Sequence, residues 1–191
     1  MAGKQAKVLT NGQLRLALTE AGRGRHGRRD QAMVLLSVKA GLRAGEIAAL
    51  TWAMVETADG QLGDRIELQD RAAKMKSGRS IPLHPSLRLA LRRLRPLRGS
   101  SSYVIESERG TRMRASSVVN WFRAFYARLD FAGCSSHSGR RTFITRAARL
   151  VFKAGGSLRD VQQLAGHRSI EQTQRYIDGD SLVKRRLVAM V

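Results

Sequence analysis

The sequence is poor in cysteine and has no long apolar run. Its one cysteine, Cys134, excludes a disulfide within the chain, and paired Cys/His spacings typical of a zinc module are absent. No apolar run approaches the ~18 residues that a membrane-spanning helix needs, and the amino terminus lacks the apolar core of a secretory signal. These absences predict a soluble protein of a reducing, intracellular compartment, with no membrane partner.

Acidic residues are also scarce. The 191 residues include 15 Asp and Glu against 35 Lys and Arg, which gives a net charge of +20. A balance this basic predicts a polyanionic partner, and nucleic acid is the most common one. Hydrophobic residues make up 42% of the chain, enough to bury the core of one large or two small domains.

The amino-terminal part is expected to be helical. Residues 1–9 form a short basic arm, and a helix over Thr10–Ala21 begins at a Thr/Asn cap. A flexible basic loop is predicted over Gly22–Arg29, after which Asp30 caps a helix over Gln31–Ala40.

Arg43 is the first residue that suggests a binding site. Gly41 begins a tight turn, and Arg43 falls at the amino-terminal end of a short helix, where a positive charge opposes the helix dipole. One explanation is a surface ion pair with Glu46, three residues on. The other is that Arg43 and the helix terminus bind one anion together.

A hairpin is expected in the middle of the chain. The alternating pattern of Arg65–Gln69 predicts a strand. Ala72–Met75 and Arg79–Leu83 are predicted to flank the turn Lys76-Ser77-Gly78, and Pro82 confines the last strand to an edge. They form a small antiparallel sheet with Lys76 near the hairpin tip. A lysine at such a tip is usually only solvated.

Two further segments carry basic residues on a helix. Ser86 is predicted to cap a helix to about Leu94, and its Arg88 and Arg92 can follow a phosphate backbone or form an ordinary solvated face. A second helix, capped by Ser135 or Ser136, runs to Leu150. His137 and Arg140 share one face of its first turn, which predicts another anion site.

The segment from Gly166 to Tyr176 brings in a candidate nucleophile. His167 and Tyr176 are nine positions apart, too far for contact along one straight helix. Gly166 is predicted to end one helix, and Ser169 to cap the next in a capping box with Gln172, so that the turn returns His167 and Tyr176 to one site. Taken alone, such a tyrosine is more often a half-buried packing residue.

Together these residues resemble the catalytic domain of the tyrosine recombinases, or phage integrase family. Four family motifs are matched in order, from about Thr10 to Asp178, and they are Gly41-Leu42-Arg43-Ala44-Gly45-Glu46, the hairpin Lys76, the box His137 to Arg140, and the box Leu164 to Tyr176. Two positions depart from the family pattern. Gly139 stands where Leu is usual, and Arg141 where His is usual, and both are expected to change support rather than chemistry.

The resemblance implies a role for each matched residue. Arg43 and Arg140 clamp the phosphate, for which a planar guanidinium is suited. Tyr176 is the nucleophile, and forming its phenolate at pH 7 costs about 4 kcal/mol from the reference pKa of tyrosine. His137 acts as base, Lys76 protonates the leaving 5′-oxygen and His167 hydrogen-bonds the phosphate.

Supporting roles and partners follow from the same resemblance. Glu46 orients Arg43 or His137, and Arg88, Arg92 and Arg141 are predicted to contact DNA. No metal and no cofactor are expected. The expected partners are double-stranded DNA and further copies of the chain in a synaptic complex that assembles on DNA, with the free protein expected to be monomeric. The expected location is cytoplasmic, associated with the nucleoid.

The expected fold is mixed α/β, mainly helical with a small antiparallel sheet. Residues 10–180 form the catalytic domain, and residues 181–191 a final helix whose apolar stripe packs on its own domain or, by family resemblance, on a neighbouring subunit. The amino-terminal DNA-clamping domain of most members is absent, which predicts either a small stand-alone member, similar to the fimbrial-switch recombinases, or a catalytic fragment.

The expected function is site-specific recombination of DNA through a covalent 3′-phosphotyrosyl intermediate. Two alternatives use the same surface: relaxation of DNA by a type IB topoisomerase, and DNA binding by a regulator that has lost catalysis. A basic structural protein fits the charge but not the spacing of the motifs.

Overall fold

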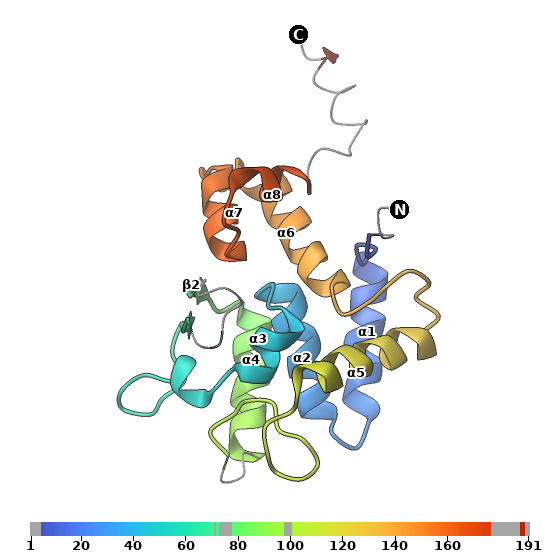
Figure 1. Cartoon of the computed structure of the whole chain (residues 1–191), viewed down its shortest axis with the longest axis vertical. Helices are drawn as coiled ribbons and strands as arrows, with labels where there is room; N and C mark the ends of the chain where they lie inside the picture. Colours follow the sequence, from blue (N-terminus) through green and yellow to red (C-terminus); the bar gives the residue numbers. More distant parts are fainter. Residues whose placement is uncertain (1–4, 71, 73–77, 98–100, 177–187, 190–191) are drawn as a thin grey trace.

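The computed structural model describes residues 5–70, 72, 78–97, 101–176 and 188–189. In this part the chain is mainly helical, with one two-stranded antiparallel sheet (Figure 1). The predicted fold class is therefore confirmed. No helix among these residues is both long enough and apolar enough to cross a membrane.

Helices α1 (Asn11–Arg23) and α2 (Gly27–Lys39) form an antiparallel pair. The predicted cap of α1 is present, because the Thr10 hydroxyl accepts from the Gln13 amide at 3.1 Å. The predicted loop over residues 22–29 is too long and the cap at Asp30 is wrong, since α1 extends to Arg23 and α2 begins at Gly27, four residues before the predicted start. Gly27 allows this tight turn, because a Cβ there would lie 2.2 Å from the carbonyl oxygen of Gly22.

The remaining elements follow in chain order. They are α3 (Ala44–Ala49), η1 (Trp52–Met54), β1 (Arg65–Leu68), β2 (Arg79–Pro82), α4 (Pro85–Leu94), η3 (Arg95–Leu97), α5 (Ala115–Arg128), α6 (Ser138–Leu150), α7 (Leu158–Ala165) and α8 (Ile170–Gln174). Helix α4 begins one residue before the predicted cap. His84 caps it instead, and its Nδ1 accepts from the Ser86 amide at 3.2 Å.

The predicted small antiparallel sheet is confirmed, with β1 paired to β2. The predicted segment Ala72–Met75 lies outside the described residues except for Ala72, which is in a turn. Ile66 of β1 pairs with Ile81 of β2, and both side chains are buried. The next pair, Glu67 and Ser80, points outward and is joined by a hydrogen bond of 3.0 Å. Lys76 lies outside the described residues, so its predicted position at the hairpin tip stays a prediction.

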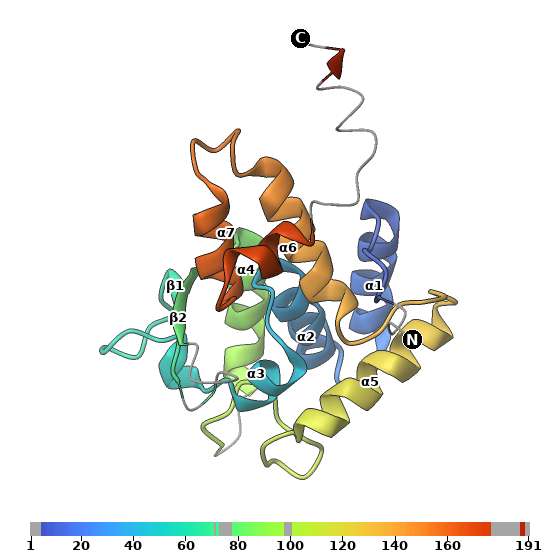
Figure 2. The same ribbon diagram turned by 45° about the horizontal axis from the view of Figure 1, so that its top comes forward.

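Buried apolar side chains fall into two clusters. The main core is formed by the inner faces of α1 to α5, with Ile66 and Ile81 from the sheet. A much smaller cluster joins α6 and α7 through Ile144, Ala148, Val151, Val161 and Ala165. In Figure 1 α7 and α8 lie together at one end of the folded domain. The turned view shows α7 close to the sheet (Figure 2).

Candidate active site

The turn before α3 fixes Arg43. Gly41 has a positive φ of 64°, and a Cβ there would lie 2.4 Å from the ring of Phe143, so this position needs glycine. Arg43 is the N-cap residue of α3. Its backbone N–H donates to Glu46 Oε2 at 2.8 Å, and its Nη1 donates to Oε1 at 2.7 Å. The predicted pair of Arg43 and Glu46 is therefore present, but the carboxylate is buried and only 1% exposed.

Arg79, which the sequence reasoning missed, completes this carboxylate site. Its side chain enters from β2 and is 6% exposed. Nη1 donates to Glu46 Oε1 at 3.1 Å and Nη2 to Oε2 at 3.0 Å, a bidentate pair. The sequence could have indicated that Arg79 points inward, because side chains two apart in a strand share one face and Ile81 is buried.

Burial alone would raise the pKa of Glu46. The hydrogen bonds and charges of Arg79 and Arg43 outweigh it, and they hold the pKa of Glu46 below its usual value. Glu46 is therefore ionised at neutral pH. Its carboxylate binds the guanidinium groups of Arg43 and Arg79, which come from different elements.

Helix α6 carries the second predicted pair. His137 is its N-cap residue and is exposed, whereas Arg140 is buried in the first turn. The predicted cap at Ser135 or Ser136 is wrong, because α6 begins at Ser138 after His137 and has no side-chain cap bond; the Ser135 hydroxyl instead accepts from the His137 amide at 3.3 Å, within the preceding turn. Gly139 lets α6 approach α2 closely, since a Cβ there would lie 2.2 Å from Ser37 Oγ.

The predicted break between His167 and Tyr176 is confirmed. Helix α7 ends at Gly166 in the left-handed region, and α8 begins after Ser169. The two rings stack with centroids 5.7 Å apart and planes inclined by 24°. The predicted capping box with Gln172 does not form, since the Ser169 side chain makes no cap bond and instead binds the Glu171 carboxylate.

His167 is oriented by α8 and kept neutral. Its Nδ1 lies 3.0 Å from the hydroxyl of Thr173, which is fully buried. Burial, and then the charges of Arg140, Arg43 and Arg79, lower the pKa of His167 to about 4. A neutral imidazole whose Nδ1 accepts from Thr173 carries its proton on Nε2, where it can donate to an anion.

Three arginines bind the carboxyl end of α7, one carbonyl each. Arg79 Nε donates to Leu164 O at 2.9 Å, Arg140 Nη2 to Ala165 O at 2.7 Å, and Arg43 Nη2 to Gly166 O at 3.5 Å. These carbonyls are the unpaired, negative end of the helix dipole. The segment that holds His167 is thereby fixed to α3, α6 and β2.

Arg140 contacts two carbonyls, the second being Gly41 O at 2.7 Å from its Nη1. Burial, followed by the charge of Arg43, lowers the pKa of Arg140 to about 10, so it stays protonated at pH 7. Arg43, Arg79 and Arg140 carry three positive charges against the single charge of Glu46. This excess of positive charge in a buried site favours binding of an anion.

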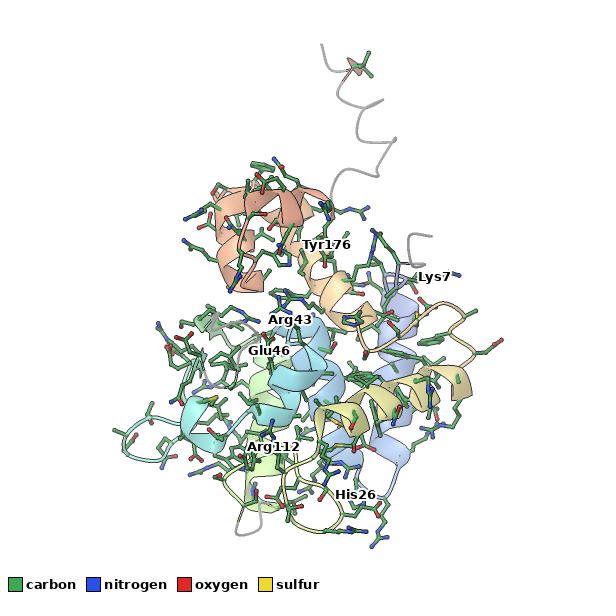
Figure 3. The ribbon with its side chains drawn as sticks, viewed as in Figure 1. Lys7, His26, Arg43, Glu46, Arg112 and Tyr176 are labelled. Atoms are coloured by element: carbon green, nitrogen blue, oxygen red, sulfur yellow. The ribbon has the colours of Figure 1, made fainter. Side chains whose placement is uncertain are left out.

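An open pocket of about 370 Å³ joins these groups. Its lining consists of Gln5, Ala6, Arg43, His137, Arg140, Arg141, His167, Gln172, Arg175 and Tyr176. Figure 3 shows Arg43 and Glu46 at the end of α3 that faces α7 and α8, with Tyr176 beyond them and His26 and Arg112 at the opposite end. The pocket thus combines a phenol, two imidazoles and paired guanidinium groups, the donors that a phosphodiester and an attacking oxygen require.

The remaining predicted site residues divide between this pocket and the surface. Arg141 lines the pocket, and its guanidinium lies 5.7 Å from the centroid of the Tyr176 ring. Arg88 and Arg92 are exposed on α4 and take no part in the pocket. Within the described residues, no group of three or more His, Cys, Asp and Glu side chains could hold a metal ion.

The amino-terminal arm also contributes to this site. The Leu9 amide donates to the Thr142 hydroxyl at 2.8 Å, and Arg146 donates to Leu9 O at 2.9 Å, so the arm is fixed to α6. Gln5 accepts a hydrogen bond from Arg141 and lines the pocket. Sequence periodicity gave no sign of these contacts, because residues 5–9 have no regular structure.

Sequence relatives point to one family. Residues 7–181 match the sequence model described as "Phage integrase family". A protein of Herpetosiphon aurantiacus named "Tyrosine recombinase XerC" is 28% identical over 180 residues, which cover 90% of this chain and 55% of that protein. Its namesake in Pseudomonas fluorescens (strain Pf0-1) is 29% identical, covering 78% of this chain and 48% of that one. This chain thus spans about half the length of these relatives.

Solved structures share the fold. The crystal structure of XerA recombinase superimposes with a TM-score of 0.76 at 21% identity, covering 96% of this chain and 64% of that chain. The Tn1549 transposon integrase in complex with transposon right end DNA gives a TM-score of 0.77 at 18% identity, covering 97% and 66%. Because the sequence model covers most of the 191 residues, this chain belongs to the phage integrase family.

Proposed function

We propose that this chain is the catalytic part of a site-specific DNA recombinase that breaks and rejoins strands through a covalent 3′-phosphotyrosyl link. One observation carries the proposal. A single pocket holds Tyr176 together with Arg43, Arg140, His137 and His167, and its buried positive charges exceed its negative ones. A phosphodiester supplies the missing negative charge, and the phenol supplies the nucleophile.

The proposed cleavage step is a transesterification. The Tyr176 hydroxyl gives its proton to His137, and the phenolate oxygen forms a bond to phosphorus as the bond to the 5′-oxygen breaks. Arg43, Arg140 and the Nε2–H of His167 bind the non-bridging oxygens, whose charge they stabilise. The leaving 5′-oxygen takes a proton, which we assign to Lys76 by family resemblance.

Rejoining runs through the same groups in reverse. A 5′-hydroxyl attacks the phosphotyrosyl phosphorus, and the tyrosine leaves with a proton returned by His137. One phosphate ester replaces another, so the two steps balance without an external source of energy. Glu46 keeps Arg43 in place and Arg141 lies beside the Tyr176 ring, where it is assigned to a DNA phosphate.

The proposed partner is double-stranded DNA, with further copies of this chain. Arg88 and Arg92 form an exposed basic face for the backbone. Among similar structures, one holds a lambda integrase tetramer bound to a Holliday junction, with a TM-score of 0.66 and 19% identity. We propose a comparable assembly, in which the tail over residues 181–191 docks on a neighbouring subunit. Residues 181–187 and 190–191 lie outside the described residues, and Val188 is exposed.

The test is formation of a covalent adduct. The protein is incubated with 5′-labelled duplexes that carry randomised sequences and a nick, and products are separated on a denaturing gel. A 3′-phosphotyrosyl link attaches the labelled fragment to the protein, so a band of protein mass is expected. Tyr176→Phe should bind the same duplexes as well as the parent and form no adduct, because only the attacking oxygen is removed.

Tyr103→Phe is the matched control. Tyr103 stacks under Arg112, at the end of the molecule far from Tyr176 (Figure 3), and its substitution should leave adduct formation unchanged. An adduct that persists in Tyr176→Phe would show that another residue is the nucleophile. Binding without any adduct in the parent would instead favour a regulator that has lost catalysis.

A further inference from the structure

We infer that Arg79 is a further positioning residue for phosphodiester transfer: it fixes the carboxylate that holds Arg43 and, with the same guanidinium, the end of the helix that carries His167. This inference rests on the proposed function. Arg79 lies outside the six catalytic residues predicted from sequence, and it is absent from the lining of the pocket that holds Tyr176.

The first half of the link is the contact with Glu46. Two nitrogens of Arg79 bind the two oxygens of Glu46 at 3.1 and 3.0 Å, and both side chains are buried. Glu46 in turn accepts from the backbone and the side chain of Arg43. Arg43 therefore owes its position to a carboxylate that Arg79 holds in place from the other side.

The second half of the link is the contact with α7. Arg79 Nε donates to Leu164 O at 2.9 Å, three residues before His167. The guanidinium also packs against Gly166, where a Cβ would lie 2.8 Å from its Nη1. Arg79 is thus the residue of β2 that joins α3 and α7 directly, and a fixed spacing between Arg43 and His167 requires both contacts at once.

A fork of donors is needed for this arrangement. A guanidinium presents five N–H groups in one plane, so it can bind both carboxylate oxygens and a carbonyl together. A lysine ammonium keeps the charge but is a single donor centre, and it cannot span three acceptors in this geometry. Arg79→Lys therefore separates the charge of Arg79 from its geometry.

The experiment measures cleavage of the nicked duplexes under single-turnover conditions at saturating DNA. Arg79→Met should cleave at least tenfold more slowly than the parent, while the Kd for DNA stays within threefold. The cleavage rate of Arg79→Lys should lie between those of the parent and of Arg79→Met. Arg29→Met is the control, because Arg29 is also a partly buried arginine that binds a carboxylate, Asp30, and a carbonyl, Glu106 O, but at the far end of the molecule.

A pH profile separates positioning from loss of stability. Glu46 faces Arg79, Arg43 and Arg140, and without Arg79 its burial favours the protonated form. The cleavage rate of Arg79→Met should therefore fall more steeply than that of the parent as the pH is lowered from 8 to 6. The double variant Arg79→Met/Glu46→Gln has no carboxylate to protonate and should lose this additional dependence on pH.

Three results would overturn the inference: cleavage by Arg79→Met within threefold of the parent, an equal defect in Arg29→Met, or the same acidic fall in the double variant. If Arg79→Met does not fold, Arg79→Lys decides, since a parental rate in that variant excludes a role for the fork. A parent that forms no adduct would instead refute the proposed function, which keeps the two failures distinct.

Discussion

The main core and the end formed by α6, α7 and α8 are held together by different forces. In the main core, α2 alone buries a continuous run of seven residues, from Ala32 to Val38. The smaller cluster has five buried apolar residues, and the loop that follows α6 leaves Phe152 69% exposed. Helix α6 packs closely on α2 at Gly139, whereas α7 is bound to α3, α6 and β2 through the contacts of Arg43, Arg79 and Arg140 with its last carbonyls.

This difference has a consequence for the site. The apolar core can be rigid without reference to a substrate, because hydrophobic contacts do not depend on what binds. The segment that holds His167 and Tyr176 is instead fixed by charged groups, two of which are assigned to the phosphate. The position of the proposed nucleophile and the proposed binding of the phosphate therefore depend on the same side chains.

The largest effect is expected from Arg140→Ala. It removes one donor to the phosphate, worth about 10² to 10³ in cleavage rate. It also frees the buried carbonyls of Gly41 and Ala165, so the melting temperature should fall. Arg43→Ala should lose a similar factor in rate with a smaller fall in melting temperature, since Arg43 is more exposed and Glu46 keeps Arg79. Equal melting temperatures in the two variants would contradict the distinction.

Substitutions that create a cavity in the main core or in the smaller cluster should affect stability and cleavage differently. Leu36→Ala and Ile144→Ala each remove a fully buried side chain and should each cost roughly 2–5 kcal/mol of stability. Leu36→Ala should lower the global free energy of unfolding but leave the cleavage rate of the folded protein near that of the parent. Ile144→Ala should speed hydrogen exchange in α7 and α8 and slow cleavage. Cleavage slowed more by Leu36→Ala would show that the two regions are one unit.

Removal of the hydroxyl beside His167 should have a moderate effect. Thr173→Val keeps the volume of a fully buried side chain but removes the partner of Nδ1, so the proton of His167 is no longer directed to Nε2. We expect about a tenfold lower cleavage rate with unchanged affinity for DNA, because Thr173 orients His167 and does not itself contact the phosphate. Thr173→Ser retains the hydroxyl and should restore most of the rate, and a defect as large as that of valine would contradict this role.

Stability should depend on pH through His167. Its folded pKa is about 4, below the reference value of 6.5, so between these values the unfolded chain binds a proton that the folded one does not. The contribution of His167 is therefore complete above pH 6.5 and is lost as the pH falls toward 4. His167→Gln should make the melting temperature depend less on pH between 6.5 and about 4. His84, whose pKa is lowered by burial and by Lys39, is the comparison, and His84→Gln should reduce this dependence less.

The smallest effect is expected on the exposed face of α4, whose other face packs in the main core. Arg92→Ala removes an exposed charge from the predicted DNA face, so affinity should fall a few-fold and the log–log salt slope should decrease by about 1. The cleavage rate at saturating DNA should not change. If the affinity for DNA at low salt does not depend on Arg92 or Arg88, α4 is not part of the DNA-binding surface.

The local features of the site could be predicted from the sequence with some accuracy. The break at Gly166, the short helix after Arg43 and the strands that contain Ile66 and Ile81 are all confirmed, because glycine conformation, capping and strand period act over a few residues. The start of α2 was wrong because a close contact between Gly22 and Gly27, rather than the capping preference of Asp30, sets it.

Residue types and their order thus determined which groups this chain brings to phosphate chemistry, since the motifs, the excess of basic residues and the break before His167 are all local properties. Only the tertiary structure decided how those groups are held. Arg79 meets Glu46 across 33 positions and Leu164 across 85, and Arg140 meets Gly41 across 99. Such contacts depend on how β2, α3, α6 and α7 pack in space, and no periodicity along the chain records that packing.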